Sequence, residues 1–530
     1  MKMFSKCLSM LIFLTFVKLI AATSLFRDEL TYQEVRNNIF AAEESMRTGG
    51  NVYLNPKETK ADAILLKLKN ETIRRGIFES RSYLPSMHFF KAKSLIEQDP
   101  IFDILKKAPK GGVLHLHNSA AVSSEWVIKN LTYRDDMRLC TTKDGLKIFN
   151  VMYDAFNLHF IYYLHLKINN FYRDLHKLCA DEPVSISATR TKAENIEEFD
   201  KNLEKLINLY TTQPEVDYPD ANAVWTRFQN MFTTIRGILD YAPTYKAFHW
   251  RLLEEHYEDN VMYVELRASL CPIVDENGKT LNSEDVVEIL FGIVEGFKKQ
   301  HENFLGMKII QAIHRSFNRS KIEEKMDKFV ELQRKFPNFI IGFDLVGQED
   351  LGVPLISFIE KLKDISQNGR FFFHAGETNF FNTEADVNIL DAILMNTKRI
   401  GHGFSLFKHP VLWSAIKEKE IAVEINPISN QVLHLVQDLR NHPASFYVSE
   451  NIPIVIGNDD PGFWNAKGVS FDYYYAFMDF TPADEGLQVL KQLAWNSLKY
   501  SAMTPKEKKN AAVVFKAEFD DFVDYILTKE

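Results

Sequence analysis

Histidines and carboxylates with the spacing of a catalytic metal site recur at four places along this sequence. These places are His115-Leu-His117, His374-Ala-Gly-Glu377, Gly401-His402-Gly403 and Asn458-Asp459-Asp460. The two-residue spacing of His115 and His117 turns both imidazoles to one face of a β-strand. Each motif alone is compatible with an ordinary structural role, so the prediction of a metal site depends on their joint occurrence.

Zinc accepts neutral imidazole nitrogens and carboxylate oxygens as ligands. Three imidazoles and one carboxylate leave a further position on the ion for a water molecule. We therefore expect one zinc ion per chain. Its predicted ligands are His115, His117, His374 and Asp459. Zinc lowers the pKa of a bound water to about 7, which makes hydroxide available at neutral pH. Glu377, one turn past a ligand, can then shuttle protons without binding the metal.

The motifs follow short runs rich in β-branched and aromatic residues, which are separated by stretches long enough for a helix. We expect strands at residues 112–117, 261–267, 307–314, 339–346, 371–375, 399–404, 422–426 and 453–457. Continuous apolar runs indicate strands that are buried on both faces, as in a parallel sheet. Eight such strands favour a (β/α)8 TIM barrel of the α/β class over a doubly wound sheet. Active sites of these barrels lie at the carboxyl ends of the strands, where the motifs stand.

The barrel sequence carries additions before its first strand and after it. Residues 1–22 have lysines before an apolar run and end in Ala21-Ala22, which predicts a cleaved secretory signal peptide. Residues 23–105 have helical spacing and form a predicted N-terminal arm. Residues 106–129 contain the first barrel strand, residues 130–205 read as an irregular insertion, and residues 206–530 complete the barrel. We expect no membrane span after cleavage and, at a net charge of -8, no nucleic-acid partner.

Export also changes how the cysteines and asparagines are interpreted. Cys140 and Cys179 flank the aromatic-rich part of the insertion, which favours a disulfide between them and leaves Cys271 free, although three unpaired thiols stay an alternative. Three sequons, at Asn70, Asn130 and Asn318, are glycosylation candidates in a secreted protein.

Over nearly the whole mature chain the sequence resembles the adenosine deaminase family, specifically its secreted adenosine deaminase-related growth factors. The most specific segments are residues 109–117 (PKGGVLHLH), 373–378 (FHAGET), 399–404 (RIGHGF), 427–431 (PISNQ) and 459–461 (DDP). The resemblance implies an extracellular enzyme that hydrolyses adenosine, and 2'-deoxyadenosine, to inosine and ammonia. It also implies that the arm mediates homodimerisation and that residues 130–205 form a domain that binds a cell-surface receptor or glycan.

The resemblance assigns roles to individual residues as well. Glu377 gives a proton to purine N1, His402 orients and helps to deprotonate the attacking water, and Asp460 assists the water or hydrogen-bonds to N7. The remaining predicted substrate contacts are the Gly347 backbone at N3, Trp225 and His314 along the pocket, and Asn118 and Gln229 at the sugar.

Asn118 and Gln229 depart from the family pattern, which has an acid at both positions. An amide still hydrogen-bonds a sugar hydroxyl, but each loses a charge-assisted bond worth roughly 1 to 2 kcal/mol. We therefore expect weaker adenosine binding or a shifted nucleoside preference. The alternative function is an extracellular growth factor or receptor ligand with weak or altered deaminase activity. A binuclear amidohydrolase would need a lysine where Val346-Gly347-Gln348 stands, and an AMP deaminase would not be exported.

Overall fold

A computed structural model describes residues 29–142, 145–150, 183–367 and 369–529. Eight parallel strands form the centre of the molecule, and each lies within or beside a segment that the sequence analysis expected. They are β1 (Gly111–His117), β5 (Val261–Ala268), β8 (Gly306–His314), β9 (Ile340–Val346), β10 (His374–Ala375), β11 (Arg399–His402), β12 (Ala422–Ile425) and β13 (Ile454–Ile456). All of their residues are buried except the last residues of β1, β8 and β9, as expected for a sheet covered on both faces.

The strands form two four-stranded sheets, in the orders β1-β5-β8-β9 and β10-β11-β12-β13. Single parallel bridges join their edges, Phe343 to Phe371 on one side and Leu116 to Asp459 on the other. The two sheets therefore close into the predicted (β/α)8 barrel.

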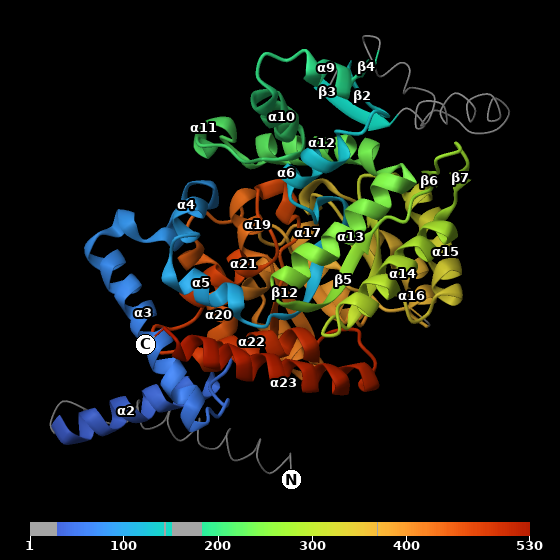
Figure 1. Cartoon of the computed structure of the whole chain (residues 1–530). Coiled ribbons are helices and arrows are strands. Elements are labelled where there is room, and N and C mark those ends of the chain that lie inside the picture. The colour runs from blue at the N-terminus through green and yellow to red at the C-terminus, as the bar shows by residue number, and fades with distance from the viewer. Residues whose placement is uncertain (1–28, 143–144, 151–182, 368, 530) are drawn as a thin grey trace.

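Helices surround the barrel and connect successive strands (Figure 1). The principal ones are α12 (Ala221–Leu239), α13 (Ala242–Glu258), α14 (Ser283–Gln300), α15 (Arg319–Lys335), α16 (Ile359–Ser366), α17 (Glu384–Leu394), α18 (Pro410–Lys419), α20 (Ala444–Ser449), α22 (Leu487–Lys499) and α23 (Pro505–Leu527). Several of these helices begin at a residue whose side chain caps the helix. Asn318, for example, caps α15 by accepting a hydrogen bond from the Lys321 backbone at 2.9 Å.

Two expectations about local structure were wrong. The described part of residues 130–205 is not irregular, because β2 (Met137–Thr142), β3 (Gly145–Asn150) and β4 (Val184–Ser185) form an antiparallel sheet beside α9 (Ile186–Thr191) and α10 (Ile196–Glu204). A buried ion pair, Arg190 to Asp200 at 2.8 Å, stabilises this unit in place of an apolar stripe that a sequence pattern could show. Strand β10 is also shorter than predicted, since Phe371 makes only a single bridge to β9.

The N-terminal region is helical, as predicted, with α2 (Glu29–Met46), α3 (Pro56–Phe78), α4 (Phe89–Ile96) and α5 (Pro100–Lys107). Helix α3 is fastened to the barrel by the buried Lys69, whose Nζ donates to Thr481 Oγ1 and to the Pro482 carbonyl, both at 2.7 Å. Helix α2 projects from the body (Figure 1), and most of its side chains are exposed, including Tyr32 and Phe40.

The remaining targeting and modification sites are only partly described. The predicted signal peptide and Cys179 lie outside the described residues, so the Cys140–Cys179 disulfide stays a prediction, while Cys271 is a free cysteine. Among the described helices, none is both long and apolar enough to cross a membrane. All three sequon asparagines lie in described segments, two of them with their side-chain amides donated to backbone carbonyls four residues earlier: Asn70 to Leu66 and Asn130 to Trp126.

Candidate metal centre and active site

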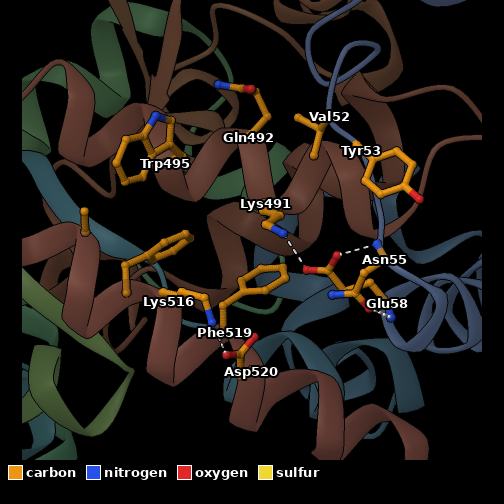
Figure 2. Close-up of a pocket in the computed structure, with 12 residues that line it drawn as sticks. Val52, Tyr53, Asn55, Glu58, Lys491, Gln492, Trp495, Lys516, Phe519 and Asp520 are labelled. Carbon is orange, nitrogen blue, oxygen red and sulfur yellow. Dashed lines mark hydrogen bonds and ion pairs between the residues drawn. The ribbon is translucent and has the colours of Figure 1, made fainter.

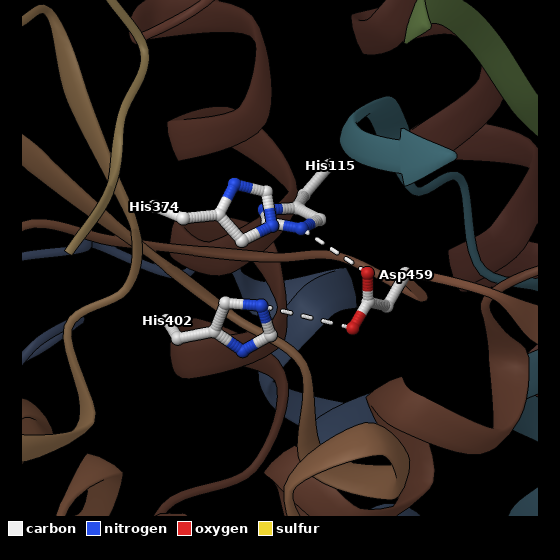
Figure 3. Close-up of side chains that lie close together, drawn as sticks. All are labelled: His115, His374, His402 and Asp459. Atoms are coloured by element: carbon white, nitrogen blue, oxygen red, sulfur yellow. Dashed lines mark ion pairs between the residues drawn. The ribbon is translucent and has the colours of Figure 1, made fainter. Parts of the chain in front are cut away.

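Polar side chains from four strand ends converge at one end of the barrel (Figure 3). His115, His374, His402 and Asp459 are all buried, and their potential ligand atoms lie within 4.8 Å of one another. His117 adjoins this group, with its Nε2 3.1 Å from Asp459 Oδ1 and 3.3 Å from His374 Nε2. The structure thus brings the four predicted zinc ligands together with His402.

These distances fit four donors that share one zinc ion. A third short separation, from His115 Nε2 to Asp459 Oδ1, is 3.2 Å. Zinc bonds of about 2.0–2.1 Å in tetrahedral geometry place neighbouring donor atoms about 3.3–3.4 Å apart. His115 Nε2 is buried and has no hydrogen-bond partner within the described residues, which a metal bond would satisfy. His402 Nε2 instead lies 3.7 Å from the other carboxylate oxygen, Asp459 Oδ2, so it faces the group from the outside.

Buried carboxylates orient two of the histidine rings. His115 Nδ1 lies 2.7 Å from Glu424 Oε2, and His374 Nδ1 lies 2.6 Å from Asp344 Oδ2. Each Nδ1–H donates to its carboxylate, which leaves the Nε2 lone pair of each ring directed at the metal position. Such carboxylate–histidine pairs fix the tautomer of a metal ligand and raise its basicity.

A layer of ion pairs beneath the site keeps these carboxylates charged. Arg267 donates to Asp344 at 2.8 Å and to Glu424 at 2.6 Å, and Arg399 donates to Glu424 and to Glu265, both at 2.6 Å. Burial by itself would raise the pKa of Glu424, but the guanidinium groups of Arg267 and Arg399 hold that pKa well below its usual range. All of these side chains are fully buried, so each charge depends on its partners.

Glu377 lies beside the metal position as a buried carboxyl group. It follows β10, and its backbone N–H donates to Glu349 Oε2 at 2.7 Å, which holds the turn after His374. Burial, together with the nearby carboxylates Asp459 and Glu349, raises the pKa of Glu377 well above its ordinary value. Its Oε1 is 3.6 Å from His402 Nδ1, so the two groups adjoin one another.

A chain of three hydrogen bonds determines which nitrogen of His402 carries the proton. The Ala444 backbone N–H donates to His442 Nδ1 at 2.9 Å, so this buried neutral ring carries its proton on Nε2 and donates to Asn430 Oδ1 at 2.8 Å. The Asn430 NH2 group then donates to His402 Nδ1 at 3.1 Å. Burial lowers the pKa of His402 well below its usual value, so its single proton is on Nε2, the atom that faces Asp459.

The backbone is unusual at two of these groups. His402 and Asp459 have left-handed conformations, with φ of 58° and 57°. This conformation costs a non-glycine residue roughly 1–2 kcal/mol and is typical of functional sites whose surroundings enforce it. Asp460 follows with one buried carboxylate oxygen, Oδ1, that has no hydrogen-bond partner among the described residues. Burial and the adjacent Asp459 carboxylate raise the pKa of Asp460.

Comparison with known proteins assigns the chain to a family. The description "Adenosine deaminase" matches residues 200–514, more than half of the chain, and "Adenosine/AMP deaminase N-terminal" matches residues 11–105. The chain belongs to the adenosine deaminase family. It is 39% identical to adenosine deaminase 2 of Homo sapiens, over 97% of this chain and 98% of that protein. It is also 39% identical to an adenosine deaminase of Phlebotomus duboscqi, over 91% of this chain and 89% of that protein.

Solved structures of lower sequence identity share the fold. Arabidopsis ADAL in complex with IMP aligns with a TM-score of 0.53 and 15% identity, over 79% of this chain and 99% of that one. An adenine deaminase from Arthrobacter aurescens aligns with a TM-score of 0.50 and 16% identity, over 79% and 100%. The chain is therefore an adenosine deaminase-family enzyme on a closed α/β barrel.

The residues that the family resemblance assigned to substrate lie around the same end of the barrel. His314 and Gly347 adjoin one another at the ends of β8 and β9, and a side chain at Gly347 would begin 2.5 Å from His314 Nε2. Gly347 also has a φ of 98°, so both the space and the backbone require glycine. Trp225 and Gln229 lie on α12, which contacts the short helix η3 (Asn118–Ala120) after β1.

The residues that position the active groups were not predicted from the sequence. They are Glu424, Arg267, Arg399, Asn430 and His442. For the first three a signal exists, because a charged residue inside an otherwise apolar strand, as in Ala422-Val-Glu424-Ile, must have a buried partner. No comparable signal marks Asn430 and His442, since their role depends on hydrogen bonds between loops.

A pocket of about 560 Å³ lies elsewhere in the molecule, between the start of α3 and the helices α22 and α23 (Figure 2). Trp495, Phe515 and Phe519 form its apolar wall, and a Lys491–Glu58 ion pair spans its edge. None of the predicted site residues lines this pocket, so it is separate from the candidate active site.

Proposed function

We propose that this chain is a zinc-dependent adenosine deaminase, which hydrolyses adenosine and 2'-deoxyadenosine to inosine or 2'-deoxyinosine and ammonia. The convergence of three histidines and one aspartate at the separations of donors that share one ion, beside the buried Glu377, carries the proposal. One zinc ion per chain would be held by His115, His117, His374 and Asp459. When bound, it would supply the Lewis acidity that lowers the pKa of a water to about 7.

The side chains around the metal position then divide the proton transfers. Glu377, protonated because of its raised pKa, gives its proton to purine N1, which makes C6 electrophilic. The water loses one proton and its oxygen bonds to C6. The proton of the new hydroxyl group passes to the exocyclic nitrogen, the C6–N bond breaks, and ammonia leaves as C6 becomes a carbonyl. The proton lost by the water restores the one that Glu377 gave to N1. His402 presents Nε2–H towards the attacking oxygen, which supports the orienting part of its expected role more directly than deprotonation.

The purine ring would be held by groups at three neighbouring strand ends. The protonated Asp460 carboxyl can donate to N7, and the Gly347 backbone would contact N3. Trp225 and His314 would line the nucleoside pocket, with Asn118 and Gln229 at the sugar. Burial of Trp225, which is 8% exposed, supports this role because a stacked purine needs a fixed apolar surface.

We also infer where the protein acts, how it is modified and which partners it binds. It would be secreted after removal of residues 1–22, glycosylated at the exposed sequons Asn70, Asn130 and Asn318, and crosslinked between Cys140 and Cys179. The exposed apolar side chains of α2 support homodimerisation through the N-terminal arm. The segment 130–205 would bind a receptor or glycan, so growth-factor activity accompanies catalysis.

An alternative is an extracellular growth factor or receptor ligand whose deaminase activity is weak or shifted to another nucleoside. The amides Asn118 and Gln229, which replace acids of the family, favour it. Under this alternative the metal site would be intact but adenosine turnover would be low.

An ammonia-release assay with zinc analysis tests the proposal. Purified protein should contain about one zinc per chain and deaminate adenosine, and Glu377→Gln should lower the rate by about 10²–10⁴-fold, the usual contribution of a general acid. The matched control is Glu418→Gln, an exposed glutamate on α18 that should keep full activity. Background rates for wild type on adenosine, 2'-deoxyadenosine and adenine would overturn catalysis in favour of the signalling alternative. Two zinc ions per chain would overturn the mononuclear site.

A further inference from the structure

Two histidines on helix α13 contact asparagines that stand next to metal-site residues. His249 Nε2 lies 2.5 Å from the side-chain amide of Asn118, which follows His117. His256 Nε2 lies 3.1 Å from the side-chain amide of Asn458, which precedes Asp459. The two rings are seven residues apart on one face of the helix, and both are fully buried.

Each ring has its proton placed by the helix itself. His249 Nδ1 lies 2.7 Å from the Tyr245 carbonyl and His256 Nδ1 lies 2.8 Å from the Leu252 carbonyl, in both cases four residues earlier. A carbonyl oxygen can only accept, so each Nδ1 must carry the hydrogen. Burial lowers the pKa of both rings, to about 4 for His249, so both are neutral and each Nε2 is an acceptor.

The asparagine opposite each ring must therefore donate. At His256 the Asn458 Nδ2 group occupies the contact, as this requires. At His249 the position nearest Nε2 is that of Asn118 Oδ1, and two acceptors cannot share a hydrogen. Oxygen and nitrogen of a side-chain amide are distinguished by their partners, so the Asn118 amide is rotated to place NH2 against His249. The Tyr245 hydroxyl, which also hydrogen-bonds Asn118, can donate or accept and is satisfied in either orientation.

We propose that His249 is a positioning residue that holds the NH2 group of Asn118 and leaves its carbonyl oxygen as the group available to a sugar hydroxyl. The inference rests on the proposed nucleoside deaminase function. The sugar end of the site is then a neutral acceptor, which takes a hydroxyl donor, and His249 determines that polarity without contacting substrate. His256, by contrast, holds the backbone segment of the metal ligand Asp459.

Substrate analogues that lack one hydroxyl test this assignment. We would measure kcat/KM for adenosine and for 2'-, 3'- and 5'-deoxyadenosine, and express each deoxy analogue as a ratio to adenosine. One hydrogen bond to a neutral group corresponds to roughly a 2- to 12-fold preference for the substrate that carries the hydroxyl. In wild type one of the three ratios should show this preference, through KM more than kcat.

Variants on α13 should then separate positioning from structure. His249→Phe keeps a ring but removes the acceptor, so the preference should fall to about one, as in Asn118→Ala, and the double variant should show no further loss. His249→Gln, whose side-chain oxygen can accept from Asn118, should keep the preference. His256→Phe should lower turnover of all four substrates equally. A preference unchanged in a folded, zinc-containing His249→Phe, or an equal fall on all four substrates, would overturn the proposal.

A spectroscopic measurement covers the case in which His249→Phe does not fold. In ¹⁵N-histidine-labelled protein, the signals lost in His249→Gln identify the ring, and they should show a protonated Nδ1 and an unprotonated Nε2 at pH 7. An Nε2–H or doubly protonated ring would refute the inference. This measurement needs no turnover, so a chain that releases no ammonia would defeat the proposed function and still decide whether His249 Nε2 is the acceptor on which the positioning of Asn118 depends.

Discussion

The two halves of the barrel differ in how regular their strands are and in what they contribute. Strands β1, β5, β8 and β9 contain seven, eight, nine and seven residues, whereas β10 to β13 contain two, four, four and three. The long strands end in ordinary extended backbone, as at His117 with φ of -94°. Among the short strands, β11 ends in the left-handed residue His402, and the left-handed Asp459 lies three residues after the end of β13.

This difference shows how rigidity and chemistry are combined in one sheet. Backbone hydrogen bonds along the long strands fix the positions of Arg267 and Asp344, whose charges stabilise the side chains of the candidate metal site. Short ladders release the chain early, so that Glu377, His402 and Asp459 can turn towards one point. The unfavourable backbone at that point persists because the regular half and the ion pairs beneath it leave no alternative conformation.

The largest expected effect is a loss of activity without a loss of stability, in the half of the barrel formed by the short strands β10 to β13. His402→Asn removes the Nε2–H group but retains a residue type that tolerates the left-handed conformation. We expect the deamination rate to fall by about 10²–10⁴-fold, while the free energy of unfolding stays near that of wild type. Steady-state assays and chemical denaturation measure the two. A large loss of stability would show that His402 supports the fold as well.

The next largest effect is a loss of stability, in the half of the barrel formed by the long strands β1, β5, β8 and β9. Arg267→Met leaves Asp344 and Glu424 without a shared buried cation, and breaking such pairs costs about 3–5 kcal/mol of unfolding free energy. Denaturant unfolding of the zinc-bound protein measures it. Arg319→Met, at an exposed ion pair on α15, is the control and should cost less than about 1 kcal/mol. Similar losses for both variants would remove the distinction between the ion-pair layer and the surface.

The smallest effect on the metal site is expected where the two halves meet, at the carboxylate that receives a hydrogen bond from His115. Glu424→Gln keeps the shape of the side chain but weakens its hold on the ring, so the zinc affinity of the folded variant should fall about 10- to 100-fold. The variant also removes the charge that Arg267 and Arg399 share, so its free energy of unfolding should fall as well. Competition with a chelator measures the affinity, and Glu418→Gln again serves as the control. Unchanged affinity would mean that the backbone of β1 alone orients His115.

Much of the fold was predictable because it is written in local patterns. The alternation of apolar runs with helical stretches identified all eight strands, and the positions of His115, His374 and Asp459 at strand ends predicted that their side chains would lie together. The sheet in residues 130–205 was not predictable in this way, because a polar segment held by the Arg190–Asp200 pair has no apolar periodicity. Strand β10 is shorter than predicted because only His374 and Ala375 pair in register with β11, although the preceding phenylalanines still make isolated backbone hydrogen bonds to both neighbouring strands.

The sequence by itself determined the chemistry of this protein: which donors can bind zinc, which acid can supply a proton, and that a barrel brings them to one end. Those features depend on residue type and on the two-residue period of a strand. Only the tertiary structure decided which nitrogen of His402 carries the proton, which carboxylates hold the rings of His115 and His374, and that His249 lies against the Asn118 amide. Each of these depends on hydrogen bonds between residues far apart in the chain, and such bonds are defined only when the fold brings donor and acceptor together.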